Sequence, residues 1–434
     1  MHPGGSHAPN HPMTSRFILR CLGLSAGIFA ATGSLLAQDN SALLNALVRK
    51  GILSDQEADD MRADLARENT AALASTSITP NLSKLIINGR IQYQFANLDT
   101  DSGGTTNDPA YVNHAFLRRV RLGIKANFLN GWSSFINYDF GSSNFDAAYV
   151  EKIFNPMWTL QAGFKKAPFG YEEYFVSSGA IKAIERSTVN RFFVESNNGR
   201  RLGGGKYRQG VWLLGKDPSG LSWELAVTNP EATGVTTGDT ITTGAATNNQ
   251  FAYWGNVGYS RPIQGTLGLF KLGASYGFLP DQGGKTLGVG DDLAVWSAYA
   301  DLRYNQFSLL GEYFGSDNER GASATRDSKS NGYWLMGSYR FGPYEPVVRY
   351  SYTDSDGRGV QLGDGIRSAS SGGTHDKLSE WFFGANWYII GNEAKHEVKL
   401  QAGFLFGESK DIPITGAPAK GTVEGFRSQL QVNF

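Results

Sequence analysis

Apolar and polar residues alternate along most of this chain, from residue 84 to the last residue. In LIINGRIQYQF (85–95), Ile87, Ile91 and Tyr93 occupy one set of alternate positions, and polar residues occupy the other. The same period of two recurs in RRVRLGIKA (118–126), WSAYADLRY (296–304) and HEVKLQAGFLF (396–406). Successive side chains of a β-strand point to opposite faces, so this pattern predicts strands with one apolar and one polar face.

The joints between these segments alternate in length. Short joints fall near residues 129–131, 155–157, 217–220, 261–265, 304–306, 341–344 and 390–395, and long ones near 99–112, 166–205, 229–250, 280–291, 315–330, 354–376 and 408–420. One joint, 142–145, is short where a long one is due. Bacterial barrels combine brief periplasmic turns with extended outer loops and have an even number of strands. We therefore predict an all-β fold, a 16-stranded antiparallel transmembrane β-barrel over residues 84–434.

A soluble secreted β-sandwich is the alternative, but it does not explain the alternation of joint lengths. The final strand, FRSQLQVNF, ends on Phe434. A terminal aromatic after an alternating strand resembles the recognition signal that the assembly machinery reads on outer-membrane barrels. Aromatic residues near predicted strand ends suit the girdles of a membrane barrel: Tyr93, Trp132, Tyr138, Trp158, Tyr259, Tyr276, Tyr304, Tyr339 and Trp387.

The first part of the chain differs in character. Residues 1–37 have the basic start, apolar run and small final residues of a signal peptide, with Met13 as an alternative start. A membrane-anchoring helix is the other interpretation. Residues 38–75 have helical apolar spacing and predict a periplasmic helical or coiled-coil segment, with a linker over 76–83. This segment is either a small structural hairpin or a contact with the cell wall or within a trimer.

Composition narrows the function. Charged residues make up 18% of the chain, and the formal net charge is zero, so no overall field favours nucleic acid. The single cysteine, Cys21, allows neither an internal disulfide nor a cysteine-based metal site. His114, His375 and His396 have no serine and acid at a recognisable motif spacing. We expect no cofactor, no metal site and no catalytic activity.

Charges on the polar strand faces predict the lining of a wet pore, where they set selectivity. By strand phase, the inward basic residues slightly outnumber the inward acids and include Arg90, Arg119, Arg121, Lys125, Lys165, Arg303, Arg340 and Arg349. Arg119 and Arg121 stand two apart on one face, where they can follow a carboxylate or phosphate. The alternative is that these arginines pair with acids of the wall and stiffen it.

Several segments, in their order and spacing, resemble the phosphate-selective porin family (porin O and porin P). They include INGRIQYQF, FLRRVRLGIKANF, INYDFGS, DAAYVEKIF, LQAGFKKAPFGYEE, AIERSTVNRFF and GPYEPVVRYSY. The resemblance implies a trimeric barrel whose third loop folds inward and narrows a pore lined by arginines. Arg90 and the pair Arg118 and Arg119 match arginines of the family's pore. Alternation turns Arg118 outward, so an inward place for it requires a β-bulge or a strand-edge position.

The third long joint carries the charges expected at the constriction: Lys166, Glu172, Glu173, Glu185, Arg186 and Arg191. Its segment KAIERSTVNRFF (182–193) predicts a short helix. Inside the pore, its acids would face basic wall residues; outside, they would be ordinary solvated charges. Phosphate-specialised family members carry a lysine where this chain has Glu173, and an acid there would weaken a phosphate trap.

These patterns together predict a porin of the bacterial cell outer membrane. It would be a passive diffusion channel for small hydrophilic solutes and would prefer anions. Phosphate is one candidate among these anions. Its expected partners are outer-membrane lipid, the permeating solutes and two further copies in a homotrimer. The alternative is a structural barrel that ties the membrane to the cell wall through residues 41–70.

Overall fold

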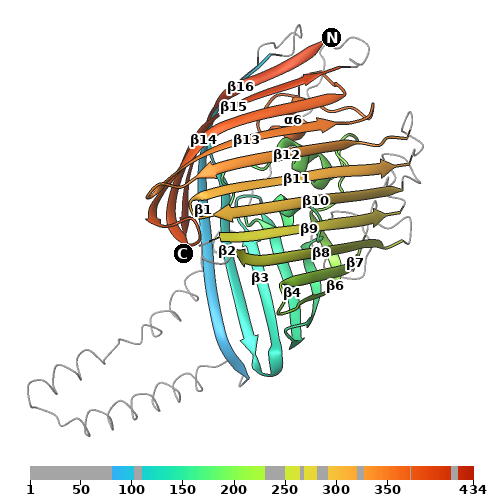
Figure 1. Cartoon of the computed structure of the whole chain (residues 1–434), viewed down its shortest axis with the longest axis vertical. Coiled ribbons are helices and arrows are strands. Elements are labelled where there is room, and N and C mark those ends of the chain that lie inside the picture. Colours follow the sequence, from blue (N-terminus) through green and yellow to red (C-terminus); the bar gives the residue numbers. More distant parts are fainter. Residues whose placement is uncertain are drawn as a thin grey trace, which may run out of the picture. The chain divides into compact units, whose positions relative to one another are not determined.

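Sixteen β-strands form a closed barrel in which consecutive strands pair antiparallel and β1 pairs with β16 (Figure 1). The predicted 16-stranded antiparallel barrel is therefore confirmed. The predicted signal peptide and helical segment lie outside the described residues. The computed structural model describes residues 81–101, 110–229, 250–263, 268–280, 292–319, 327–371, 373–411 and 419–434.

The strand boundaries fall at the predicted joints. Because neighbouring strands run antiparallel, the long joints lie at one end of the barrel and the short ones at the other, apart from the short β3–β4 joint. The strands are β1 (Leu82–Asp101), β2 (Ala110–Phe128), β3 (Trp132–Asp139), β4 (Asn144–Asn155), β5 (Trp158–Lys166), β6 (Tyr207–Lys216), β7 (Leu221–Thr228), β8 (Ala252–Ile263), β9 (Gly268–Leu279), β10 (Leu293–Tyr304), β11 (Phe307–Asn318), β12 (Asn331–Tyr339), β13 (Tyr344–Asp354), β14 (Lys377–Gly391), β15 (His396–Lys410) and β16 (Lys420–Asn433). The short helical elements of the described chain are η1 (Leu129–Gly131), η2 (Tyr171–Phe175), α4 (Thr188–Val194) and α6 (Leu362–Gly365).

The two faces of the barrel wall differ as the alternation predicts. On β1, Ile91 and Tyr93 are exposed on the outside, whereas Gln92 and Gln94 are buried inside. The inner glutamines bond to one another across the seam, since Gln94 Nε2 donates to Gln429 Oε1 at 2.8 Å. An apolar exterior with a polar interior is the arrangement that a membrane barrel requires.

A β-bulge interrupts the pairing of β1 with β2. Gln92 lies opposite Arg119, but the next residue of β1, Tyr93, lies opposite Leu117, so Arg118 is the extra residue. A bulge re-aims the side chains on either side of it. The predicted need for a bulge at Arg118 is therefore confirmed, and Arg118 and Arg119 both face the interior.

The last residue closes the seam of the barrel. The backbone N–H of Gly89 donates to the Phe434 carbonyl at 2.7 Å, and the Phe434 N–H donates to the Gly89 carbonyl at 3.1 Å. The Phe434 ring lies over Gly89, because a Cβ on Gly89 would sit 2.2 Å from that ring. The side chain nevertheless stays 66% exposed, on the outer face as predicted.

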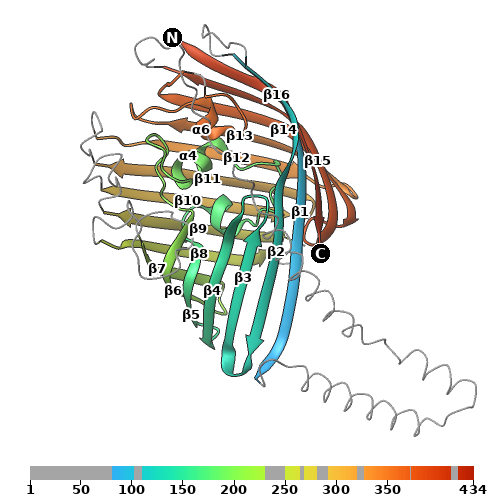
Figure 2. The same cartoon turned by 180° about the vertical axis from the view of Figure 1, so that it is seen from behind.

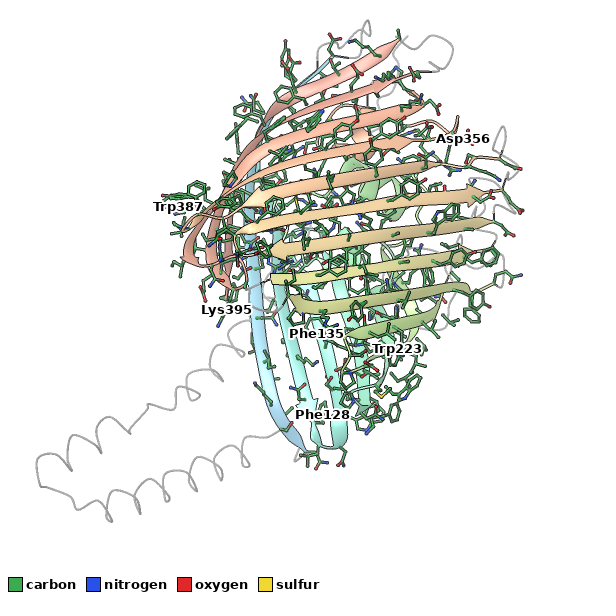
Figure 3. The ribbon with its side chains drawn as sticks, viewed as in Figure 1. Phe128, Phe135, Trp223, Asp356, Trp387 and Lys395 are labelled. Atoms are coloured by element: carbon green, nitrogen blue, oxygen red, sulfur yellow. The ribbon has the colours of Figure 1, made fainter. Side chains whose placement is uncertain are left out.

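Aromatic side chains gather on the outer surface at the end that carries the short turns. Trp158 packs edge-on against Trp223 with ring centroids 5.7 Å apart, and Tyr344 lies 6.0 Å from Trp387. Figure 3 shows Trp223 and Trp387 near the ends of their strands. Tryptophan and tyrosine favour the membrane–water interface, so this belt agrees with the predicted girdle.

The loop between β5 and β6, here called loop 3, folds into the barrel (Figure 2). It carries η2 and α4, and every residue of α4 is buried. The helix packs through Phe193, whose ring stacks on Phe314 of β11 at 5.2 Å, and Ser187 caps its first turn by accepting from Asn190 N–H. The helix predicted from KAIERSTVNRFF is present in the second half of that segment, and the inward loop is confirmed.

The loop between β13 and β14, here called loop 7, also enters the barrel. Its helix α6 contacts α4, β15 and β16. Leu362 and Ile366 are buried in the hydrophobic cluster that α4 shares with the wall. No helix among the residues that the structure describes is long and apolar enough to cross a membrane.

Candidate constriction and anion site

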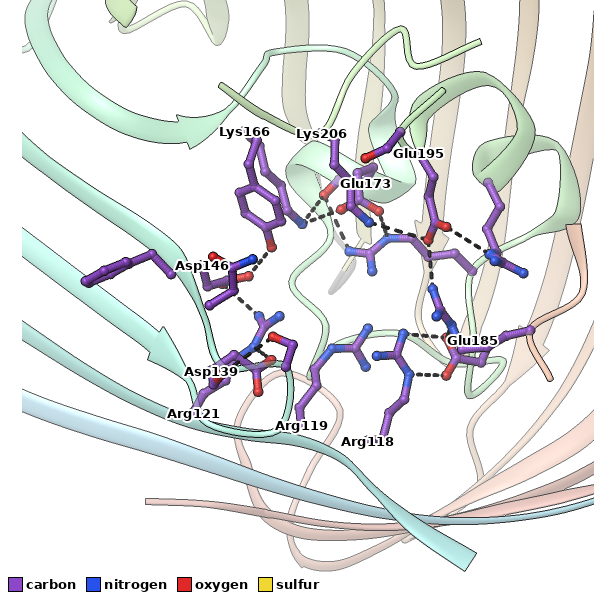
Figure 4. A pocket seen from close by; sticks show the side chains of 18 of the residues that line it. Arg118, Arg119, Arg121, Asp139, Asp146, Lys166, Glu173, Glu185, Glu195 and Lys206 are labelled. Atoms are coloured by element: carbon purple, nitrogen blue, oxygen red, sulfur yellow. Dashed lines mark hydrogen bonds and ion pairs between the residues drawn. The ribbon is translucent and has the colours of Figure 1, made fainter. Parts of the chain in front are cut away.

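Loop 3 leaves a cavity of about 310 Å³ between itself and the inner wall of β2–β6 (Figure 4). The wall contributes arginines from β2 and acids from β3 and β4, while loop 3 contributes acids and further cations. The charged lining residues are Arg118, Arg119, Arg121, Asp139, Asp146, Lys166, Glu173, Glu185, Arg186, Arg191, Glu195, Lys206 and Arg367.

Two of the wall arginines are held by carboxylates. Arg118 Nε and Nη2 donate to the two oxygens of Glu185 at 2.5 and 3.1 Å. Arg121 donates to Asp139 through Nε at 2.8 Å and to Asp146 through Nη1 at 2.7 Å. Bidentate and shared carboxylate contacts fix a guanidinium in place, so these two side chains form a rigid edge of the cavity.

Arg119 differs from both of its neighbours. Its Nη1 donates to the Gln92 side-chain oxygen at 2.7 Å, and it forms no ion pair with any other described residue. The pairing of wall arginines with wall acids thus accounts for Arg121 but not for Arg119. A guanidinium with donors left over is suited to a carboxylate or phosphate of a solute.

Glu173 is one of the acidic residues that loop 3 contributes to the cavity. Its carboxylate pairs with Lys166 Nζ and with Arg186 Nε, each at 2.6 Å. Burial alone would raise the pKa of Glu173, but the charges of Arg186 and Lys166 outweigh it and lower the pKa to about 2. Glu173 therefore stays ionised and neutralises part of the positive charge of the loop.

Two further loop acids are surrounded by cations. Glu185 binds Arg118 and lies 3.4 Å from Arg367 Nε, while Glu195 binds Arg367 Nη2 at 2.8 Å and lies 3.5 Å from Lys206. Burial opposes ionisation of both carboxyls. The neighbouring cations, Arg118 foremost for Glu185 and Lys206 foremost for Glu195, hold both pKa values well below the usual range.

The charges of the cavity do not cancel. Eight of its lining residues are lysine or arginine and five are aspartate or glutamate, which leaves a formal excess of three positive charges. In a narrow cavity with low-dielectric walls, such an excess attracts anions and repels cations.

Residues 86–248 and 280–434 match the family model of the phosphate-selective porins O and P. The chain belongs to this family of outer-membrane porins. No match is found among curated protein sequences.

Solved structures of a porin and of two other outer-membrane proteins share the barrel of this porin. An anion-selective porin from Comamonas acidovorans is 14% identical, with a TM-score of 0.55 over 81% of this chain and 99% of that one. The outer-membrane channel DcaP of Acinetobacter baumannii is 12% identical, with a TM-score of 0.51 over 81% and 97%. OmpT, an outer-membrane protein of Vibrio cholerae, is 8% identical, with a TM-score of 0.51 over 81% and 99%. At these identities the likeness is one of fold.

The predicted site residues of the porin fall into two groups. Those that line the cavity are Arg118, Arg119, Arg121, Lys166, Glu173, Glu185, Arg186 and Arg191. The others lie outside its lining. Among them, Lys125 pairs with Glu151 at 3.1 Å, and Lys165 pairs with Glu224 at 3.1 Å. Arg303 pairs with its own neighbour on β10, Asp301, and Arg340 lies in the β12–β13 turn.

Three of the predicted residues outside the lining belong to the attachment of loop 3. Arg349 is buried and donates to the Glu185 carbonyl at 2.6 Å while it binds Glu380 at 3.1 Å. Arg90 donates to Ser178 Oγ of the loop at 2.7 Å. The third, Glu172, accepts from the N–H and hydroxyl of Ser187 at the start of α4. These side chains position the constriction of the porin.

The charged or polar lining residues that were not among the predicted sites are Asp139, Ser142, Asn144, Asp146, Glu195, Ser196, Lys206, Tyr207 and Arg367. Asp146 and Tyr207 hydrogen-bond to one another on the wall, and Lys206 and Arg367 approach Glu195. Asp146 and Lys206 could have been suspected, because one lies in a family-like segment and the other ends loop 3. Arg367 gave no signal, since it lies in a glycine- and serine-rich stretch with no periodicity.

Proposed function

We propose that this outer-membrane porin is a passive diffusion channel that prefers small hydrophilic anions at the constriction between loop 3 and strands β2–β6. The observation that carries this proposal is the excess of positive charge in the cavity, with Arg119 free of any carboxylate among the described residues. An anion entering the cavity exchanges its hydration for guanidinium donors. The anion-selective porin from Comamonas acidovorans has the same kind of barrel, which supports the proposal.

Phosphate is not singled out. Glu173 occupies the place of the family lysine and already binds Lys166 and Arg186, so these two cations are not available to a polyvalent anion. We therefore infer a general preference for anions rather than a phosphate trap. From the family we further infer a homotrimer, and we expect no enzymatic activity.

The experiment is a measurement of reversal potential with purified porin in planar lipid bilayers. Under a gradient of KCl, the potential should have the sign of a chloride-selective pore. A cation-selective sign would refute the proposal. Absence of conductance steps would refute the channel itself and favour a structural barrel. Added inorganic phosphate should reduce the chloride current only at concentrations comparable to chloride.

A further inference from the structure

Loop 7 is built into the interior of the barrel rather than extending from it. Ile366 packs over Gly407 of β15, where a Cβ would lie 2.2 Å from the Ile366 Cδ1 atom. Leu362 is fully buried beside Gly421 of β16. Because these contacts bury apolar side chains against the wall, they hold the polar part of loop 7 at a fixed height in the lumen.

Polar contacts then attach loop 7 to the second half of loop 3. Asp364 accepts from Arg200 Nε at 2.6 Å and Nη2 at 3.2 Å, and from Asn198 Nδ2 at 2.7 Å. Burial would raise the pKa of Asp364, but the hydrogen bonds from Arg200 and Asn198 outweigh it and lower the pKa. Arg358 of loop 7 adds a bond from Nε to the Arg200 carbonyl at 2.6 Å.

The attached loop brings one cation into the constriction, Arg367. Its Nη2 lies 2.8 Å from Glu195, its Nε lies 3.4 Å from Glu185, and its side chain lines the cavity with 30% of its surface exposed. Arg427 of β16 donates to the Arg367 carbonyl and so fixes the backbone beneath it. Arg367 is thus both immobilised and open to the solute.

We propose that Arg367 is a specificity-determining residue, and that loop 7 completes the constriction that loop 3 begins. This role of Arg367 rests on the proposed anion preference of the pore. Glu185 and Glu195 both face the cavity, and Arg367 is the cation that binds both of them. Its guanidinium shields a passing anion from the negative charges of Glu185 and Glu195. The exposed part of the same guanidinium attracts that anion.

The charges that remain in the cavity without Arg367 decide how the anion preference changes. Loss of Arg367 reduces the formal excess in the cavity from three positive charges to two and uncovers the loop acids on their solute side. Glu185 keeps Arg118, and Glu195 keeps Arg191 and Lys206, so both acids remain ionised and attached. The pore should then keep its width while it loses part of its anion preference.

The test compares Arg367→Gln with Arg358→Gln in planar bilayers, where conductance and reversal potential are measured on the same channels. Arg358 is the matched control, because it lies in the same loop and contacts loop 3 but does not line the cavity. Arg367→Gln should lower the chloride-to-potassium permeability ratio by about twofold or more. Arg367→Lys should restore most of it, and Arg358→Gln should leave it at the wild-type value.

An unchanged ratio in Arg367→Gln, or an equal fall in Arg358→Gln, would overturn the inference. So would a rise in single-channel conductance in Arg367→Gln, because it would make Arg367 only an attachment of the loop. A wild-type pore without anion preference refutes the proposed function instead, and the comparison of variants separates that result from failure at Arg367.

Discussion

At the scale of single residues, the cavity separates arginines by their partners. Arg118 and Arg121 are held by carboxylates, whereas Arg119 between them binds only a glutamine side chain among the described residues. The bulge at Arg118 makes this possible, because it turns two successive arginines to the same side. A paired guanidinium is largely neutralised by its carboxylate, so Arg119 should act most strongly on a permeating anion.

Arg119→Gln should therefore lower the chloride-to-potassium permeability ratio. A unit charge near a passing ion is worth about 1 kcal/mol in a wet pore, which corresponds to roughly a fivefold change in the ratio. The measurement is the reversal potential in a KCl gradient. Arg303→Gln is the control, since Arg303 faces the lumen outside the cavity lining and is paired with Asp301. Equal effects of the two substitutions would contradict this assignment.

At the scale of elements, loop 3 combines two kinds of attachment. The apolar side of α4 packs on Phe314 and its neighbours in the wall. Arg90 holds the loop at Ser178, and Arg349 holds it at Glu185, just before α4. Around the cavity, ion pairs of Glu173, Glu185 and Glu195 fix the loop's charged edge. The apolar contacts do not depend on pH, whereas the ion pairs do.

The constriction should consequently resist moderate acid. The folded-state pKa of Glu173, about 2, lies below its value of about 4.3 in an unfolded chain. Ionised Glu173 thus contributes about 3 kcal/mol to the stability of the folded constriction. This contribution is fully present above the unfolded-state pKa and is lost as pH falls through about 2. Glu185 and Glu195 shift in the same direction. Single-channel conductance should be alike at pH 7 and pH 4 and should rise near pH 2, as the charged edge of loop 3 detaches. A rise already at pH 4 would contradict this account.

At the scale of the whole molecule, the barrel depends on a seam between its first and last strands. β1 and β16 pair from Arg90 and Asn433 to Asp101 and Thr422, and Phe434 extends the pairing to Gly89. The Phe434 ring is 66% exposed, so its burial adds little to the stability of the finished barrel. From the sequence we therefore expect Phe434 to act in the assembly of the barrel rather than in its final stability.

Phe434→Ala should reduce the yield of folded porin in the outer membrane far more than the stability of the porin that does fold. The yield is measured as the fraction with heat-modifiable gel mobility, and the stability as the temperature at which that mobility is lost. Phe404→Ala is the matched control, because Phe404 is an outward aromatic of similar exposure within β15. If both variants fold with equal yield, the terminal residue carries no special signal.

The predictable part of this porin is the part that depends on local pattern. Strand phase placed Arg119 inside and Phe434 outside, because each side chain's face follows from its own position in a strand. The inward course of loop 3 was implied by family resemblance alone. The course of loop 7 was not predictable, since Ile366 packs on a glycine 41 positions further along the chain, and Arg367 finds its acids in another loop.

The cavity touches only one flank of the cylinder. All of its wall residues belong to β2–β6 or the joints between them, while α4 packs against β12–β14 and α6 against β15 and β16. The proposed route for solutes is thus eccentric, and the flank on which the two loops pack holds them in place. Substitutions on the flank that carries the loops should change the thermal stability of the protein. Substitutions on the flank that lines the cavity should change its ion selectivity.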